Sequence, residues 1–579
     1  MYDIIIRGGM IVDGSGGAPF VGDVAISGDR IAAVGVVDGV GRREIDATGR
    51  IVTPGFVDIH THYDGQATWD AEMGPSSWHG VTTVVMGNCG VGFAPAKPDR
   101  HQWLIGLMEG VEDIPGTALA EGMTWDWESF PEYLDALEKL PRTIDVGTHV
   151  PHGAVRAYVM GERGAKNEAP TETDIAAMSR IVEEGLRAGA LGFSTSRTIL
   201  HKSVDGELVP GTTATVEELL GIGRAMGRVG HGVFEMASDL KREWNEFAWM
   251  GQLSRETGLP VTFAALESPA KELPLTEQIA MMTAENEKGA NIVAQIALRG
   301  NGILMAWRGT VHPFLFKPAW AEIAALSWEA KLERLRDPDF KARMIAEESV
   351  FPESDVAGLL MLVAGGWFLQ YRMGDDFNYE PPREETIAAI ATAEGRNPVE
   401  VAYDLLMAGD GDGFIYFPLL NYADGDLKFL EPLIGRDDTV NSLSDGGAHC
   451  GTICDAASPT FMLQHWVRDR VGMRQPLEAA IKRQCRDTAL LYGLADRGLL
   501  APGLLADINV IDLDRLKLGK PWLAFDLPAG GKRLLQKADG YDYTIKSGQV
   551  TFEQGVLQDA RPGGVIRGPQ RAPLAMAAE

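Results

Sequence analysis

The chain of 579 residues is poor in cysteine and histidine and contains no long hydrophobic run. Its four cysteines are too few for a disulfide framework, which makes a reducing cytoplasm the expected compartment. The longest apolar stretch, residues 359–369, has about half the length that a membrane-spanning helix needs. The N-terminal sequence MYDIIIRGG enters a strand pattern directly, without the basic region or cleavage site of a secretory signal. Neither membrane insertion nor secretion is therefore expected.

Basic residues are also scarce: the chain has 53 lysines and arginines but 81 aspartates and glutamates, so its net charge is −28. A surface this negative repels phosphate backbones and anionic lipids, so nucleic acids and membranes are not expected partners. The same charge also promotes solubility, which is its plainest interpretation. A small molecule is the partner to expect, and assembly into a homo-oligomer stays open.

Short strand patterns occupy both ends of the chain. Residues 1–54 contain runs such as DIIIRGG, DVAIS and RIAAVG between Gly and Asp turns, and residues 501–560 contain ADINVIDLD and YDYTIKSGQVTFEQG. Because chain ends often lie close together, we predict one small β-sandwich domain built from both segments. The Ala-, Pro-, Gly- and Arg-rich stretch at 561–579 is expected to form a mobile tail.

Strand and helix patterns alternate between residues 55 and 500. Several strands are followed by helical stretches such as TETDIAAMSRIVEEGLRAG, which begins with a Thr cap. Eight such units predict an α/β fold with a (β/α)8 TIM-like barrel, and an open doubly wound sheet is the alternative. The long spacing before the last strand predicts a helical insertion at about 300–438 that forms a lid. The predicted barrel strands are residues 56–62, 82–88, 143–149, 190–196, 232–238, 260–266, 291–298 and 439–445.

The first two predicted barrel strands end in residues that bind metals. His60 and His62 stand in HTHYDG, and residues i and i+2 of a strand face the same side, so both imidazoles can hold one ion at the barrel mouth. Cys89 stands between glycines in MGNCGVG, where a thiolate would reach the same ion. The alternative for Cys89 is a small, inert core residue.

The last predicted strand ends in Asp445, within NSLSDGGAH. A carboxylate at this place can bind the metal, and it can also take a proton from an attacking water and pass it to a leaving nitrogen. Elsewhere in a sequence the same Asp-Gly pair would indicate a turn. His449, four residues later, is a candidate substrate contact, and support of the metal site or a plain loop position are its alternatives.

Several segments of the chain resemble the amidohydrolase superfamily, and more narrowly its D-aminoacylase or N-acyl-D-amino-acid deacylase branch. The similarity covers nearly the whole chain and implies zinc, a metal-activated water, a metal-binding cysteine after the second strand and a catalytic aspartate on the eighth. These implied roles fall on His60, His62, Cys89 and Asp445. The segments are TPGFVDIHTHYDG, the GNCG loop, GALGFSTS, the terminal SDGG and DRGLLAPGLLADINVIDLD.

The chain departs from that branch at the ends of strands five and six. The branch has metal-binding histidines there, whereas this sequence has Met236 and Ala265. Glu235 and Glu267 stand one or two positions away and are candidate oxygen ligands, although a one-residue slip reverses the facing of a strand side chain. No lysine lies in GALGFSTS, so a carboxylated lysine cannot bridge two metals there. One or two zinc ions, or another divalent metal, are compatible with this pattern.

Basic side chains near the strand ends are candidates for binding a substrate carboxylate. THVPHGAVR resembles a His-Gly-x-x-Arg segment of the branch, which nominates His152 and Arg156. Arg197 and His201 follow the fourth strand, and Arg299 follows the seventh. Arginine can hold a carboxylate through two parallel hydrogen bonds. The alternative is that these side chains form ordinary ion pairs or solvated loop charges.

The sequence thus predicts a metal-dependent hydrolase that cuts a carbon–nitrogen bond other than a peptide bond. By resemblance, the expected substrate is an N-acyl amino acid, D-configured if this chain follows the branch. A hydrolase of a cyclic amide, lactam, ester or carbamate on the same fold is an alternative. A metal-poor, non-catalytic scaffold is another, but folding requires neither the histidine pair nor Asp445, and their joint presence argues against it.

Overall fold

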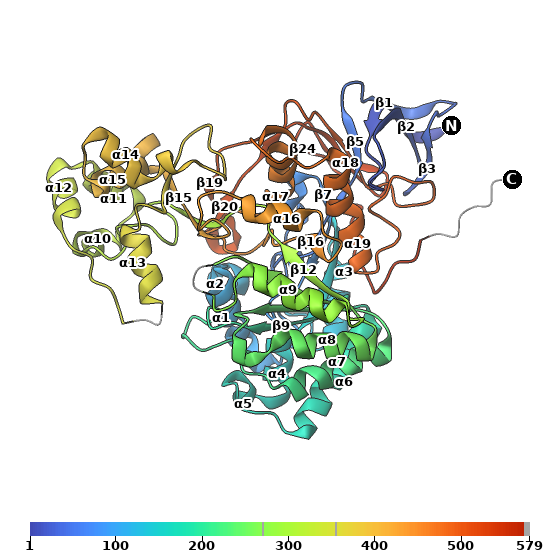
Figure 1. Cartoon of the computed structure of the whole chain (residues 1–579), viewed down its shortest axis with the longest axis horizontal. Helices are drawn as coiled ribbons and strands as arrows, with labels where there is room; N and C mark the ends of the chain where they lie inside the picture. The colour runs from blue at the N-terminus through green and yellow to red at the C-terminus, as the bar shows by residue number, and fades with distance from the viewer. Residues whose placement is uncertain (269–270, 354–355, 573–579) are drawn as a thin grey trace.

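The structure is a computed structural model that describes residues 1–268, 271–353 and 356–572. Its centre is a sheet of eight parallel strands in the order β16-β12-β11-β10-β9-β8-β7-β6 (Figure 1). The chain pairs Thr61 with Gly446 in parallel, which joins the extensions of the first and last strands. The sheet therefore curls into the predicted TIM-like barrel. Its strands are β6 (Phe56–Asp58), β7 (Val81–Met86), β8 (Asp145–Pro151), β9 (Gly192–Arg197), β10 (Val233–Ser238), β11 (Val261–Ala265), β12 (Ile292–Ile296) and β16 (Thr439–Asn441).

Helices connect the barrel strands and cover the outside of the sheet (Figure 1). The predicted Thr cap is confirmed, since Thr171 begins α6 with a reciprocal capping box to Asp174. The helices are α1 (His101–Glu112), α2 (Gly116–Gly122), α3 (Phe130–Glu138), α4 (His152–Met160), α5 (Glu162–Ala165), α6 (Glu172–Ala188), α7 (Val216–Val229), α8 (Glu246–Thr257), α9 (Leu275–Asn286), α16 (Glu431–Ile434), α17 (Ser458–Phe461), α18 (Leu477–Lys482) and α19 (Thr488–Leu491). Two π-helical segments, Met462–Asp469 and Arg483–Asp487, follow α17 and α18.

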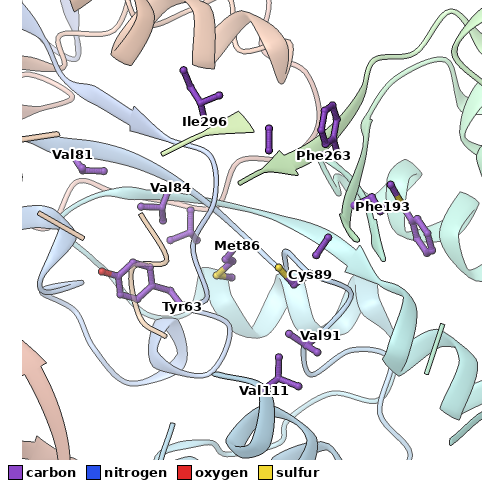
Figure 2. Packing of buried hydrophobic residues seen from close by; sticks show 14 of the residues in the cluster. Tyr63, Val81, Val84, Met86, Cys89, Val91, Val111, Phe193, Phe263 and Ile296 are labelled. Atoms are coloured by element: carbon purple, nitrogen blue, oxygen red, sulfur yellow. The ribbon is translucent and has the colours of Figure 1, made fainter. Parts of the chain in front are cut away.

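The barrel strands are buried along nearly all of their length, including the polar residues of β8 and β9. Every residue of β7 is buried, because a parallel sheet covered by helices has no solvent-facing side. Its side chains Val81, Val84 and Met86 pack in the largest hydrophobic cluster, and Cys89 lies at the end of the same strand (Figure 2). This packing fixes the strand ends, and it thereby positions the side chains at the barrel mouth.

Strands from both chain ends form a second sheet, as predicted. Its order is β24-β23-β22-β17-β5-β1-β2-β3, and β4 pairs with β1. The two ends meet where Val510 pairs with Val52 in antiparallel register. The strands are β1 (Tyr2–Ile11), β2 (Phe20–Ser27), β3 (Arg30–Gly35), β4 (Gly41–Asp46), β5 (Ile51–Pro54), β17 (Ile508–Ile511), β22 (Tyr541–Lys546), β23 (Gln549–Glu553) and β24 (Val556–Leu557). Two short antiparallel strand pairs precede β22: the hairpin of β19 (Trp522–Leu527) and β20 (Gly531–Leu535), and outside it the pair of β18 (Lys517–Leu518) and β21 (Ala538–Asp539).

A buried group of charges joins this second sheet to the barrel. Asp145 at the start of β8 lies 2.7 Å from Arg497 and 2.9 Å from Lys546 of β22, measured between carboxylate oxygen and nitrogen. Lys546 also pairs with Asp507 at 3.0 Å. Because all four side chains are largely buried, each charge depends on its partners for compensation.

The insertion between β12 and β16 forms a separate lobe, which projects to the left of the barrel in Figure 1. It is not purely helical, because it also contains a three-stranded antiparallel sheet in the order β13-β15-β14. Trp307 and Phe314 pack inside the lobe's own hydrophobic core. A lid role for this lobe stays a prediction. Its elements are β13 (Asn301–Met305), α10 (Pro318–Ile323), α11 (Trp328–Arg336), α12 (Pro338–Ala346), α13 (Ala357–Gly365), β14 (Tyr371–Met373), α14 (Ile387–Glu394), α15 (Pro398–Gly411) and β15 (Phe414–Leu420).

The segment 561–572 does not form the expected mobile tail. Its Val565 pairs with Val146 of β8, and the Ile566 amide donates to the Val146 carbonyl at 2.8 Å. The Ile566 side chain is 4% exposed and packs with Leu191 and Val233. Apolar burial therefore holds this segment against the amino ends of the barrel strands. Residues 573–579 of the expected tail lie outside the described residues. No helix in the described ranges is long and apolar enough to cross a membrane.

Candidate metal centre

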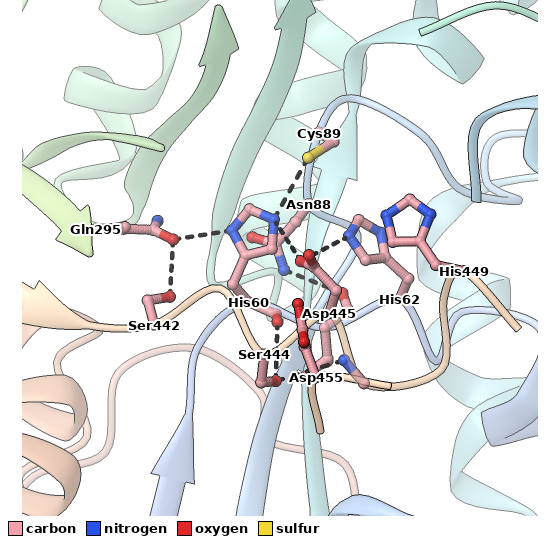
Figure 3. Close-up of polar contacts among 12 residues, drawn as sticks. His60, His62, Asn88, Cys89, Gln295, Ser442, Ser444, Asp445, His449 and Asp455 are labelled. Atoms are coloured by element: carbon pink, nitrogen blue, oxygen red, sulfur yellow. Dashed lines mark hydrogen bonds and ion pairs between the residues drawn. The ribbon is translucent and has the colours of Figure 1, made fainter. Parts of the chain in front are cut away.

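Two imidazoles project into the barrel mouth directly after β6. His60 and His62 face the same side, as residues i and i+2 of an extended segment do, and Figure 3 shows both imidazoles beside Asp445. Their side chains are 2% and 1% exposed. The predicted histidine pair is thus buried at the carboxyl end of the first barrel strand.

The donor atoms of His60, His62 and Cys89 all lie within 4.8 Å of one another, and no other such group of three occurs within the described residues. His60 Nε2 is 3.4 Å from Cys89 Sγ. Asp445 Oδ1 lies 3.6 Å from His60 Nε2 and 3.8 Å from His62 Nε2. Zinc bonds of about 2.0–2.3 Å at tetrahedral angles separate ligand atoms by roughly 3.3–3.7 Å. Three of the four predicted side chains therefore suit one ion, and Asp445 lies beside the two imidazoles.

The loops that carry these groups have strained backbones. Cys89, Asp445 and His449 adopt positive φ angles of 55°, 47° and 50°, in the left-handed region that residues other than glycine rarely occupy. Such strain persists only where the surroundings enforce it, and it is concentrated at functional sites. Each of these turns returns its side chain toward the barrel mouth (Figure 3).

Gln295 of β12 orients the first imidazole. Its Oε1 accepts a hydrogen bond from His60 Nδ1 at 2.8 Å and another from Ser442 Oγ at 2.8 Å, while its amide nitrogen donates to Thr262 at 3.0 Å (Figure 3). A proton on Nδ1 leaves the Nε2 lone pair free to face Cys89 and Asp445. Sequence reasoning missed Gln295, although its inward-facing position in a predicted strand could have indicated it.

Burial and charge act differently on the two histidines. Burial lowers the pKa of His60 to about 4, so its imidazole is neutral at physiological pH. Burial also opposes the charged form of His62, but the carboxylates of Glu112 and Asp445 outweigh it and raise the pKa of His62 to about 9. His60 is therefore a neutral nitrogen ligand, whereas His62 lies among the negative charges of Glu112 and Asp445.

The thiol and the carboxylate complete this electrostatic pattern. Burial, together with nearby carboxylates such as Glu235, raises the pKa of the Cys89 thiol well above its ordinary value. For Asp445, burial opposes ionisation, but the nearby imidazoles of His62 and His60, 3.8 and 3.6 Å from its Oδ1, outweigh it and hold the pKa below its usual range. A bound divalent cation would deprotonate the thiol and offset the buried acidic charge. The donor set of two imidazoles, a sulfur and a carboxylate thus fits a metal such as zinc.

The two additional candidate ligands lie outside this donor group. Glu235 Oε2 accepts the Cys89 amide at 3.0 Å, and its Oε1 is 3.9 Å from His60 Nδ1, on the side of the ring away from Cys89 Sγ. Glu235 therefore supports the Cys89 loop. Glu267 does not belong to the group either, and its carboxylate accepts the Leu275 amide at 3.0 Å at the start of α9, so a ligand role for it stays a prediction.

The positions where the resembling branch has further histidines provide no strong zinc ligand. Met236 and Ala265 are buried, and both belong to the main hydrophobic cluster. A methionine thioether is a weak ligand for zinc, and alanine offers none. A second ion held through these two positions therefore does not fit this chain.

The candidate substrate residues His152 and Arg156 instead form a closed internal network. His152 Nε2 lies 3.0 Å from Glu218 Oε1, and Arg156 Nε contacts the same oxygen at 3.0 Å. His152 Nδ1 also bonds Thr195 at 2.8 Å. Both basic side chains are almost fully buried and engaged with Glu218, so this arrangement does not support their expected contact with substrate, which stays a prediction. Their charge partner comes from α7, which no local sequence pattern reveals.

Two predicted arginines are also engaged within the protein. Arg197 Nε donates to Glu246 at 2.7 Å, and its guanidinium lies over the Trp244 ring. Arg299 Nε donates to Asp455 at 2.8 Å, and its guanidinium carbon is 3.8 Å from the centre of a tyrosine ring. Because each is buried and has an acidic partner, neither is free to bind a substrate carboxylate in this arrangement.

His201 and His449 do lie near the centre. Burial lowers the pKa of His201 to about 3, and the charges of His449 and His62 act in the same direction. His201 Nδ1 bonds Ser196 Oγ at 2.9 Å. The His449 side chain is 25% exposed and stands beside His62 in Figure 3. Both remain candidates for contact with substrate.

Sequence reasoning also missed Glu112, the last residue of α1. Its carboxylate oxygens lie 3.3 Å from His62 Nδ1 and 3.6 Å from His449 Nε2. A glutamate at a helix end carries no local signal that it points into an active site.

Known proteins share the sequence pattern and the fold of this chain. The chain is 27% identical to the D-aminoacylase of Alcaligenes xylosoxydans xylosoxydans, across 88% of each sequence. Its fold is shared by a solved D-aminoacylase structure from work on a binuclear metal centre, with a TM-score of 0.65, 23% identity and coverage of 98% and 100% of the two chains. N-acyl-D-glutamate deacylase from Bordetella bronchiseptica, solved with zinc and a phosphonate inhibitor, gives a TM-score of 0.62, 22% identity and the same coverage. Residues 43–552 match the model of the Amidohydrolase family, so the chain belongs to that family and is a metal-binding hydrolase of non-peptide carbon–nitrogen bonds.

Proposed function

We propose that this enzyme hydrolyses the amide bond of N-acyl amino acids, with preference for the D configuration. The observation that carries the proposal is the convergence of His60, His62, Cys89 and Asp445 at the barrel mouth. The D-aminoacylase and N-acyl-D-glutamate deacylase relatives support the substrate class.

The chain's own residues account for the proton transfers of this reaction. A zinc ion bound at the centre would polarise the amide carbonyl and acidify a water. Asp445 is ionised and 19% exposed, so it can accept the proton of the attacking water. Protonated Asp445 then delivers that proton to the leaving nitrogen, which releases the amine and restores the carboxylate.

We further propose that the working enzyme holds one zinc ion per chain. His60, His62 and Cys89 provide three donors for one ion, and Asp445 lies beside them, so a fourth position stays open for water or substrate. Met236 and Ala265 occupy the places of the histidines that the resembling branch uses for more. The solved D-aminoacylase is described as having one-metal activation and second-metal attenuation. We expect excess zinc to have no such attenuating effect through these positions here.

A substrate panel with a metal control tests the proposal. Purified protein is assayed for amine release from N-acetyl-D- and N-acetyl-L-amino acids, and for turnover of a hydantoin, a lactone and a carbamate. Chelation should abolish activity, and one equivalent of zinc should restore it. Turnover of only the cyclic or carbamate substrates would replace the proposed linear amide with the alternative bond. Tight zinc binding without turnover of any substrate would favour a scaffold.

A further inference from the structure

The last residue of α1, Glu112, lies at the barrel mouth and carries a buried carboxylate that takes no part in the proposed proton transfers. Glu112 is 1% exposed. A carboxylate so deeply buried is costly unless positive groups or hydrogen-bond donors compensate it. The groups in contact with it should therefore indicate its role.

The first partner of Glu112 is a metal-ligand histidine. His62 Nδ1 is buried and has no hydrogen-bond partner within the described residues, and it lies 3.3 Å from Glu112 Oε1. Its Nε2 faces Asp445 and the other donors. An imidazole that binds metal through one nitrogen is held in place when its other nitrogen donates to a carboxylate. At 3.3 Å, Glu112 Oε1 is the carboxylate oxygen that lies within reach of this unpartnered His62 Nδ1.

The second partner comes from the loop after the last barrel strand. The backbone amide of His449 donates to the Glu112 carbonyl, and His449 Nε2 lies 3.6 Å from Glu112 Oε2. One side chain thus contacts imidazoles from the first and the last strand ends. The neighbouring Asp113 extends this junction, since it accepts the Gly451 amide at 3.0 Å and the Thr310 hydroxyl of the insertion at 3.2 Å.

We propose that Glu112 is a positioning residue that orients His62 toward the metal and ties the His449 loop to it. The inference rests on the proposed function, because it requires a metal at His62. Glu112 touches neither the donor face nor the reacting groups, so it acts through the two imidazoles. Its loss should weaken metal binding and also disturb the substrate contact that we expect from His449.

The test compares Glu112→Gln with Asp113→Asn. Both variants neutralise a carboxylate at the same helix end, but only Glu112 contacts a metal ligand. The zinc Kd is measured by competition with a chromophoric chelator, and the absorption spectrum of the cobalt-substituted protein reports ligand geometry. We expect Glu112→Gln to weaken zinc binding about 10–100-fold and to change the cobalt spectrum. Asp113→Asn should bind zinc like the wild type.

Several results would overturn the inference. Wild-type zinc affinity in Glu112→Gln would show that the carboxylate does not hold His62. Equal losses in both variants would indicate general loosening of the helix end. Should Glu112→Gln not fold, Glu112→Asp decides, because it keeps the charge but shortens its reach, and an unchanged Kd would contradict the proposal. Absence of zinc binding by the wild type would instead overturn the proposed function.

Discussion

Replacement of Asp445 by asparagine isolates the proton-transfer role that we assign to this residue. Asparagine has nearly the same shape, so Oδ1 can stay near His60 Nε2 and His62 Nε2, at the 3.6 and 3.8 Å of the wild type. The three donors His60, His62 and Cys89 remain, and the variant should retain metal. The amide cannot accept the proton of the attacking water, so the base is lost while the site keeps its form.

The expected loss follows from that role. A positioned general acid–base group contributes about 10²–10⁴-fold to a rate, which corresponds to about 3–5 kcal/mol in the barrier. Initial rates on the best N-acyl amino acid, with metal content measured by mass spectrometry, give the comparison. Asp437→Asn, an exposed position that precedes the same strand, is the matched control and should keep full activity. An Asp445→Asn enzyme with full metal and more than a tenth of wild-type kcat would refute the assigned role.

Three further predictions concern the metal and the packing. Cys89→Ser should weaken zinc binding by at least about 10-fold with little loss of fold, and chelator competition with thermal unfolding measures both. Asp145→Asn removes one of two acidic partners from both Arg497 and Lys546, which keep Asp496 and Asp507, so it should cost less than the roughly 3–5 kcal/mol of a fully broken buried pair, measured by urea unfolding at neutral pH. Burial opposes ionisation of Asp145, but Lys546 and Arg497 outweigh burial and lower the pKa of this carboxyl. The ionised carboxylate therefore stabilises the fold above pH about 4. The difference in unfolding free energy between wild type and Asp145→Asn should shrink as the pH falls below that value. Ile566→Ala should cost about 2–5 kcal/mol, whereas the exposed Val556→Ala should change stability by less than about 0.5 kcal/mol; equal effects would contradict the packing of the C-terminal segment.

The barrel and the metal centre could be predicted because their signals are local. Apolar strands ending in HTH, NCG and SDGG can be found in the sequence, and a barrel brings all carboxyl strand ends to one mouth. His60, His62, Cys89 and Asp445 are therefore close in space although nearly 400 positions separate the first from the last.

The roles of the basic residues nominated for substrate binding could not be predicted in the same way, because these roles depend on partners that are distant in the sequence. Arg156 follows a strand like a substrate-binding residue, but Glu218 from α7 neutralises it. Glu112 shows the reverse case: it ends an ordinary helix, and only the folded chain places it beside His62 and His449. Composition predicts a mobile C-terminal tail, but the few apolar residues of segment 561–572 pack against the barrel, and this packing surface exists only once the barrel has formed.

A crystal structure of the zinc-loaded protein, with anomalous scattering recorded at the zinc edge, tests the account most directly. We predict one strong peak per chain, bonded to His60 Nε2, His62 Nε2 and Cys89 Sγ, with Asp445 in contact. Absence of a peak between these groups, or a metal bound elsewhere in the barrel, would contradict the account.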